Sequence, residues 1–276
     1  MDTQQIRRLE LTARDLRALI VRGVGVNQKG HLGGSCSIAD VVAALYFYKM
    51  RHDPKRPDWR ERDRFVFSKG HAALVQYAAL ALSGYFPVED MDRVKHFGSP
   101  LQGHPDLRKT RGVEANTGSL GQGLSTACGM AAGVRIDGYN SCVYCILGDG
   151  EIAEGQIWEA AMAAAHFKLD NLVAVLDSNR LQATGVCGER FNTYPHREKW
   201  ESFGWAVSDV DGHDMAAIVA VLDRIEQEKG RPHLVIAHTI KGKGISFAEG
   251  KVAFHNGSLT QAQYDQALSE LAKAGM

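Results

Sequence analysis

The residues best placed to do chemistry are Gly148, Asp149 and Gly150, which follow directly on the apolar run 142–147. The run has the length and composition of a buried strand, and the glycines allow a sharp turn and the close approach of a ligand. Asn179 stands just past the end of the next such run. Neighbouring parallel strands end at one edge of a sheet, where ligands bind in open α/β folds. We therefore expect Asp149 and Asn179 to face the same ligand.

A carboxylate and an amide at one sheet edge are oxygen donors that suit a divalent cation. With the backbone carbonyl of Leu181 and the phosphate oxygens of a ligand, Asp149 and Asn179 would complete the octahedron that Mg²⁺ prefers. The alternative reading is a plain turn with an Asx cap. A dinucleotide site is not expected, because no G-x-G-x-x-G motif follows a predicted strand.

Strand and helix signals alternate through the middle of the chain. The expected strands lie at 142–147, 172–177, 205–210 and 233–239, and the expected helices lie near 70–83, 119–135, 156–168 and 215–228. Ser37 with Asp40, and Thr260 with Gln263, have the spacing of helix capping boxes. Continuous apolar strands separated by helices indicate a mostly parallel, twisted sheet with helices on both faces. The whole chain, residues 1–276, is therefore predicted to be one α/β domain.

Three connections are long for a compact domain, at about 96–118, 178–200 and 240–259. Loops beyond ~12–15 residues are usually functional or disordered. The second and third follow expected strands directly, which places them at the ligand-binding edge of the sheet. Lys241 and Lys243, in the third loop, could steer phosphates, but we favour a solvated loop for both.

Composition excludes several classes of protein. The 32 basic and 32 acidic side chains give a formal net charge of zero, so the chain lacks the positive field of a nucleic-acid or acidic-membrane binder. The N-terminus shows no secretory signal, and no stretch approaches the ~18 apolar residues of a membrane helix. Five scattered cysteines fit free thiols in a reducing compartment, and we expect a cytoplasmic protein. Cys142 and Cys145 would point to opposite faces of their strand, so we expect core residues rather than metal ligands.

Six segments taken together resemble the transketolase family in their content, order and spacing. They are GHLGGS (30–35), SKGHAA (68–73), QGHPD (102–106), NTGSLGQGLS (116–125), GDGEIAEGQIWEA (148–160) and DSNRLQATG (177–185). The resemblance runs from about residue 10 to 257 and covers only the domain that binds the diphosphate of thiamine diphosphate. It implies thiamine diphosphate and Mg²⁺ as cofactors, with Ca²⁺ or Mn²⁺ as substitutes for Mg²⁺. It also implies transfer of a two-carbon ketol unit from a ketose phosphate to an aldose.

The resemblance implies roles for individual residues. The side chains of Asp149 and Asn179, with the carbonyl of Leu181, would hold the metal. Contacts with the cofactor are implied for His71, Gly118, Ser119, Leu120, Gly148, Gly150, Glu154, Asn179 and His255. The implied catalytic side chains, whose imidazoles can donate hydrogen bonds and shuttle protons near neutral pH, are His31, His104 and His255. Glu154 and Glu159 match acidic residues that the family places where its two active sites meet; a helix N-terminus that favours acidic side chains is the alternative.

The chain differs from full-length transketolases in its extent. Those enzymes continue into a pyrimidine-binding domain and a C-terminal domain, whereas this sequence stops at Met276 after an expected helix near 260–274, which we read as a native ending. GHLGGS also resembles the corresponding segment of split transketolase subunits. The resemblance therefore implies a second subunit that carries the missing domains, in an α2β2 assembly that acts on sugar phosphates.

Three alternatives stay open. Pentose phosphates are the default substrates, but a transketolase outside the pentose phosphate pathway would use a branched, deoxy or sulfonated sugar phosphate. The α subunit of a 2-oxoacid dehydrogenase carries a similar GDG…N domain and would release carbon dioxide. A degenerate domain with a binding or regulatory role is the non-enzymatic alternative, although the intact Asp149 and Asn179 speak against it.

Overall fold

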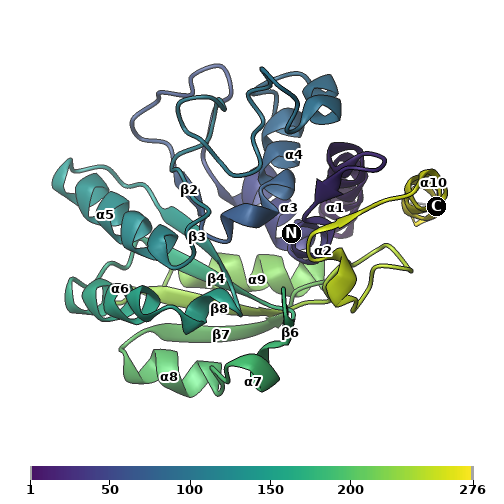
Figure 1. The fold of residues 1–276 in the computed structure, drawn as a ribbon. Helices are drawn as coiled ribbons and strands as arrows, with labels where there is room; N and C mark the ends of the chain where they lie inside the picture. The colour runs from purple at the N-terminus through teal and green to yellow at the C-terminus, as the bar shows by residue number, and fades with distance from the viewer. Residues whose placement is uncertain (1, 275–276) are drawn as a thin grey trace.

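The structure, a computed structural model, describes residues 2–274. At its centre lies a five-stranded parallel sheet with the strand order β2-β3-β4-β8-β7 (Figure 1). The strands are β2 (Arg64–Phe67), β3 (Val143–Gly148), β4 (Leu172–Ser178), β7 (Ala206–Asp211) and β8 (His233–His238). The predicted α/β fold with a parallel sheet is confirmed.

Both faces of the sheet are buried, because apolar side chains alternate along each strand between two hydrophobic cores. On β3, Tyr144 and Ile146 pack into one core, whereas Val143, Cys145 and Leu147 pack into the other. Helices on the first face are α1 (Thr3–Val24), α3 (Ala39–Ala44), α4 (Leu74–Ser83) and α9 (Met215–Ile225); those on the second are α5 (Gln122–Ile136), α6 (Gly155–His166) and α8 (His196–Ser202). The two helical layers hold the strand ends in fixed positions (Figure 1).

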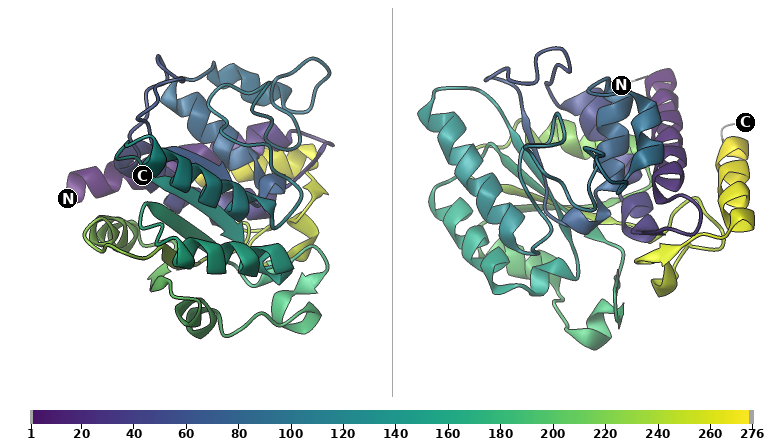
Figure 2. Two further views of the ribbon diagram at one scale, coloured as in Figure 1. Left: turned by 90° about the vertical axis from the view of Figure 1, so that its left-hand side faces the viewer. Right: turned by 45° about the horizontal axis from the view of Figure 1, so that its top comes forward.

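The remaining elements lie around the sheet edge and the periphery. They are the helices α2 (Leu32–Ser37), α7 (Cys187–Arg190) and α10 (Gln261–Lys273), the strands β1 (Lys29–Gly30), β5 (Leu181–Gln182), β6 (Gly185–Val186) and β9 (Gly257–Ser258), the 3-10 turns Gly70–Ala72, Val88–Arg93, Glu151–Ala153 and Val252–Phe254, and the π-helical turn Leu45–Lys49. The helix α10 lies beside α1 at the outer edge (Figure 2). Antiparallel pairing of β1 with β9 joins segments from opposite ends of the chain.

Some local expectations were wrong, each for a local reason. The expected helix 70–83 is interrupted, because a 3-10 turn at Gly70–Ala72 precedes α4. The helix expected from 119 begins only at Gln122, since Gly118 and Gly121 adopt positive φ angles of 137° and 85°. The strand β2 was not predicted at all, because it is four residues long and follows a run of charged side chains.

The two expected capping boxes had opposite outcomes. Thr260 and Gln263 cap α10 reciprocally, as predicted. Ser37 and Asp40 do not form a capping box: the Ser37 hydroxyl donates to Asp177 at 2.6 Å, and Asp40 pairs with Arg17. Both side chains therefore bond to buried charged groups instead of capping a helix.

The expected long connections contain more structure than predicted. The 178–200 segment includes β5, β6, α7 and the start of α8, and the 240–259 segment includes a 3-10 turn and β9. The five cysteines are free, and Cys142 and Cys145 pack on opposite faces of the sheet as predicted. Within residues 2–274, none of the helices is long and apolar enough to span a bilayer.

Candidate active site

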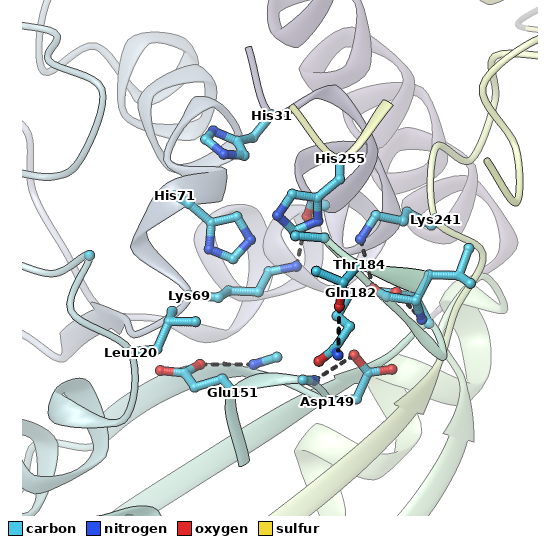
Figure 3. A pocket seen from close by; sticks show the side chains of 17 residues that line it. His31, Lys69, His71, Leu120, Asp149, Glu151, Gln182, Thr184, Lys241 and His255 are labelled. Atoms are coloured by element: carbon cyan, nitrogen blue, oxygen red, sulfur yellow. Dashed lines mark hydrogen bonds between the residues drawn. The ribbon is translucent and has the colours of Figure 1, made fainter. Parts of the chain in front are cut away.

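A cavity of about 420 Å³ opens at the carboxyl ends of β3 and β4 (Figure 3). Its lining consists of His31, Gly34, Lys69, His71, Gly118, Leu120, Gly148, Asp149, Gly150, Glu151, Asn179, Leu181, Gln182, Ala183, Thr184, Lys241 and His255. Most of the predicted site residues thus lie together, because parallel strands present their carboxyl ends, and the loops that follow them, at one edge.

Asp149 lies in the turn after β3 and is almost fully buried, with 2% of its surface exposed. Its carboxylate accepts backbone N–H bonds from Gly150, at 2.9 Å, and from Arg180, and the Cys187 thiol donates to it at 3.5 Å. Burial, followed by the negative charge of Asp177, raises the pKa of Asp149 to about 6. A divalent cation beside this carboxylate would offset both effects.

Asn179 and Leu181 supply neutral oxygen atoms to the same cavity as Asp149. The amide of Asn179 donates to Asp177 at 3.0 Å and accepts the N–H of Leu181 at 3.1 Å, which fixes its orientation. The carbonyl of Leu181 accepts a hydrogen bond from the ammonium of Lys241 at 2.8 Å. Carboxylate, amide and carbonyl oxygens are the donors that Mg²⁺ prefers, so these residues fit such an ion. Residues 2–274 hold no group of three or more His, Cys, Asp or Glu arranged to bind a metal, so the ligand would have to supply further oxygens.

A buried ion pair between Lys69 and Asp177, which was not predicted from the sequence, supports the end of β4 next to Asn179. The ammonium of Lys69 contacts the carboxylate of Asp177, and their side chains are 2% and 0% exposed. Lys69 also donates to the carbonyl of Gly34 at 2.7 Å. Burial alone would raise the pKa of Asp177, but Lys69 and the hydroxyls of Ser37 and Thr239 hold it below its ordinary value. Asp177 therefore stays charged and holds Asn179 by its amide.

Glu151, also missed, ties the glycine-rich segment before α5 to the end of β3. Its carboxylate accepts the N–H groups of Gly121 at 3.0 Å and Gly148 at 2.9 Å, and the hydroxyl of Ser68 at 2.5 Å. Burial raises its pKa above the ordinary value. These contacts fix the backbone at Gly121, three residues after Gly118, which lines the cavity.

Three of the predicted histidines form one cluster on the cavity wall (Figure 3). The ring centroids of His31, His71 and His255 lie 5.0 to 5.5 Å apart. The pairing of β1 with β9 brings the first and the last of them together, because His31 directly follows β1 and His255 lies just before β9.

All three rings are neutral at pH 7. Burial lowers the pKa of His31 to about 4, of His71 to about 2 and of His255 to about 3, and nearby lysine ammonium groups add to the effect. Each neutral ring offers one N–H donor and one lone pair. Within the described part of the chain, the buried Nδ1 of His255 has no hydrogen-bond partner, so it is available to a ligand.

Lys241 was expected in a solvated loop, and this expectation was wrong. Lys241 is only 2% exposed. Its burial, and to a lesser extent repulsion from Lys69, lowers its pKa to about 8. Lys241 lines the cavity, where its ammonium would attract the oxygens of a phosphate group. Lys243 fits the expectation better, since its side chain is 35% exposed and lies 4.0 Å from Glu249.

Not every predicted residue reaches the cavity. Ser119 and Glu154 are exposed and lie outside its lining, and Glu159 is exposed on α6. His104 is also outside the lining, but its ring packs against Gly118: a Cβ added there would lie 2.6 Å from the ring. His104 therefore lies at the edge of the cavity, where burial and Lys95 lower its pKa.

Comparison with known proteins agrees with this geometry. Residues 9–273 match the family model described as "Transketolase, thiamine diphosphate binding domain". Along its full length the chain is 47% identical to the 6-deoxy-6-sulfo-D-fructose transketolase subunit SqwG of a Clostridium species, and both chains are covered completely. It is also 42% identical to an apulose-4-phosphate transketolase subunit of Phocaeicola vulgatus, covering 98% of this chain and 95% of that one.

Solved structures of full-length transketolases match over almost the whole chain. The enzyme of Campylobacter jejuni superimposes with a TM-score of 0.89 at 32% identity, covering 99% of this chain and 43% of that one. A variant of the Pichia stipitis enzyme gives a TM-score of 0.91 at 32% identity, covering 96% and 41%. This chain thus spans less than half the length of the solved transketolases. The family predicted from six sequence segments is confirmed: the chain belongs to the transketolase family and matches its thiamine diphosphate-binding domain.

Proposed function

We propose that this chain is the diphosphate-binding subunit of a two-subunit transketolase. The enzyme would use thiamine diphosphate and Mg²⁺ to move a two-carbon ketol unit from a ketose that carries a phosphate or sulfonate group to an aldose. One observation carries the proposal: Asp149, Asn179 and Leu181 share a cavity with two buried lysines and a cluster of neutral histidines.

The residues of the cavity suit a diphosphate group and its metal. Asp149, Asn179 and the carbonyl of Leu181 would hold the cation, and Lys69 and Lys241 add positive charge opposite the phosphate oxygens. Glycine backbone keeps this part of the cavity open. A Cβ at Gly150 would lie 2.9 Å from the amide oxygen of Gln182, so a side chain there would close the approach.

The histidines would handle the protons and oxygens of the sugar. When bound, thiamine diphosphate supplies the nucleophile and the electron sink for the reaction. The chain orients the sugar: His31 and His255, with His104 at the edge of the cavity, can donate to its carbonyl and hydroxyl oxygens and accept protons from them, whereas His71 would contact the cofactor.

A partner subunit is supported by the names of the relatives that this chain matches from end to end, since these are called subunits. We propose that the partner carries the pyrimidine-binding and C-terminal domains in an α2β2 assembly. We also propose a cytoplasmic location, with which the free cysteines are compatible.

A specialised sugar substrate is favoured over pentose phosphates. The two relatives with the higher identities are named for 6-deoxy-6-sulfo-D-fructose and apulose 4-phosphate, at 47% and 42%, whereas the human transketolase is 38% identical. We propose a donor or acceptor that is deoxy, branched or sulfonated. The 2-oxoacid dehydrogenase alternative has no support, because the matching family model is that of transketolase.

Reconstitution with the candidate partner subunit tests the proposal. The chain, the partner and both together would be assayed with thiamine diphosphate, Mg²⁺ and an aldose phosphate as acceptor. The donor would be 6-deoxy-6-sulfo-D-fructose or xylulose 5-phosphate, and the sugar products would be identified by mass spectrometry. We expect ketol transfer only from the mixture, and faster with the sulfonated donor. Robust turnover by the chain alone would refute the two-subunit proposal, and carbon dioxide release from a 2-oxoacid without ketol transfer would refute the reaction.

A further inference from the structure

His213 connects a buried ion pair to the loop that carries two cavity residues. It lies in the turn between β7 and α9, and its side chain is 13% exposed. Its Nδ1 lies 2.8 Å from a carboxylate oxygen of Asp40, and its Nε2 accepts the backbone N–H of Ile240 at 2.9 Å. Because the Ile240 amide can only donate, Nε2 must carry the lone pair, and Nδ1 carries the proton that is donated to Asp40.

Asp40 is held in turn by Arg17 on α1. The guanidinium donates to both carboxylate oxygens, at 3.1 and 2.5 Å, and to the carbonyl of Cys36 at 3.2 Å. The side chains of Arg17 and Asp40 are 8% and 11% exposed. A bidentate pair of this kind fixes the position of the carboxylate, and the carboxylate fixes the tautomer and tilt of the His213 ring.

Ile240 stands at the start of the 240–259 segment, directly before Lys241. Two further backbone bonds follow: the carbonyl of Lys241 accepts the N–H of Gly250 at 2.9 Å, and the N–H of Gly242 donates to the carbonyl of Gly33 at 3.0 Å. Lys241 is therefore flanked by two backbone anchors, and its ammonium reaches the carbonyl of Leu181 at 2.8 Å. Loss of the Ile240 anchor would leave the backbone before this lysine with a longer bond, from the N–H of Thr239 to the carbonyl of Ser178 at 3.3 Å, and with the bond from the N–H of Lys243 to the carbonyl of Ile240 at 3.1 Å.

We propose that His213 is a positioning residue, which aims the ammonium of Lys241 at the cofactor's diphosphate by anchoring Ile240 through its Nε2 lone pair. The inference rests on the proposed function, because it assumes that a diphosphate occupies the cavity. His213 itself touches neither the cavity nor the metal-facing residues: it acts through the backbone of one loop.

Two substitutions separate the two hydrogen bonds of the ring. In His213→Asn the amide nitrogen takes the place of Nδ1 and keeps the bond to Asp40, but nothing reaches Ile240. In His213→Gln the amide oxygen takes the place of Nε2 and keeps the bond to Ile240. With the chain and its partner subunit together and Mg²⁺ in excess, calorimetry should show the Kd for thiamine diphosphate raised about tenfold in His213→Asn and less than about threefold in His213→Gln.

A double-mutant cycle with Lys241→Met distinguishes aiming from general support. If His213 acts through the ammonium, His213→Asn should change the Kd by less than about twofold once the ammonium is gone. His238→Asn is the matched control, because the ring of His238 bonds Asp209 at the same sheet edge, at 2.8 Å, and not the backbone of Ile240. It should leave the Kd unchanged.

Hydrogen exchange gives a readout that does not depend on the cofactor. The Ile240 amide should exchange faster in His213→Asn than in His213→Gln, while α9 stays equally protected in both. A full tenfold effect of His213→Asn in the Lys241→Met background, or an equal loss of affinity in the two His213 variants, would overturn the inference. If His213→Asn fails to fold, His213→Gln tests the inference by itself: a tenfold loss of affinity for thiamine diphosphate in that variant would overturn it. Failure of the wild-type pair of subunits to bind thiamine diphosphate would instead refute the proposed function.

Discussion

Replacement of Lys69 by methionine should show how strongly the buried ion pair supports the cavity. Lys69 is 2% exposed and its ammonium contacts the fully buried carboxylate of Asp177. Methionine keeps an apolar side chain of similar length but removes the charge. Asp177 would then hold a negative charge in the interior with only neutral donors, from Ser37, Thr239 and Asn179.

The expected loss of stability is large. Removal of one partner from a buried ion pair costs about 3–5 kcal/mol, because the other charge is left uncompensated. For a chain of this size each kcal/mol lowers the Tm by roughly 2–4 °C, so Lys69→Met should melt about 6–20 °C below the wild type. Lys69→Met/Asp177→Asn removes both charges and should recover more than half of that loss, with a coupling energy of about 2–3 kcal/mol.

Urea and thermal unfolding followed by tryptophan fluorescence would measure these changes, since Trp200, on α8, and Trp205, just after it, are buried in the core. Lys243→Met is the matched control: its ammonium is partly exposed, 4.0 Å from Glu249, and should contribute less than about 1 kcal/mol. A loss below about 1 kcal/mol in Lys69→Met, or a double variant as unstable as the sum of the two single ones, would refute the reasoning.

Three further predictions concern single sites. Asp149→Asn should weaken metal-dependent binding of thiamine diphosphate at least about tenfold in calorimetry while the Tm stays equal or rises, because a buried charge is removed; unchanged metal dependence would contradict the assigned role. Gly118→Ala should lower the Tm and reduce kcat/KM at least about tenfold, since φ is 137° and the new methyl would press on the ring of His104; Gly129→Ala, in open space on α5, is the control. Burial lowers the pKa of His196 to about 4, so the unfolded state binds the extra proton first, and this side chain contributes a fall in stability of about 3 kcal/mol as pH drops from about 6.5 toward 4. Because the lowered pKa values of His31, His71 and His255 add to the fall, His196→Gln should reduce the slope of the pH–stability curve without flattening it; an identical curve would refute the contribution of His196.

The sequence predicted the central strands and the meeting of Asp149 with Asn179 for the same reason. A strand buried on both faces must be apolar throughout, so its ends are marked by the first glycine or polar residue. Those ends lie at one edge in any parallel sheet, and the function follows from which residues stand there. The exception, β2, is too short and too close to charged residues to give such a signal.

Lys69, Asp177, Glu151 and Lys241 could not be placed from periodicity, because each depends on a partner far away in the sequence. Lys69 and Asp177 lie 108 positions apart, and Glu151 accepts from a backbone amide 30 positions earlier. A weak signal existed for Asp177: a carboxylate that ends a continuous apolar strand needs a buried partner. The sequence identifies such a need but not the residue that meets it.

The charges around the cavity link the metal and the diphosphate to each other. Besides burial, the charge of Lys69 lowers the pKa of Lys241, and both lysines lower the pKa of His71 and His255, so a bound anion would reduce the first repulsion, which is between cations. The second repulsion is between carboxylates: Asp177 is paired with Lys69, but its charge still raises the pKa of Asp149, so a bound cation would reduce it. A dication alone would reduce the repulsion between the carboxylates and increase that among the cationic side chains. A diphosphate alone would have the opposite effects. Only the metal ion and the diphosphate together relieve both repulsions, so binding of one should raise the affinity of the cavity for the other. If one of the two is shown not to bind, the assignment of the other loses its basis.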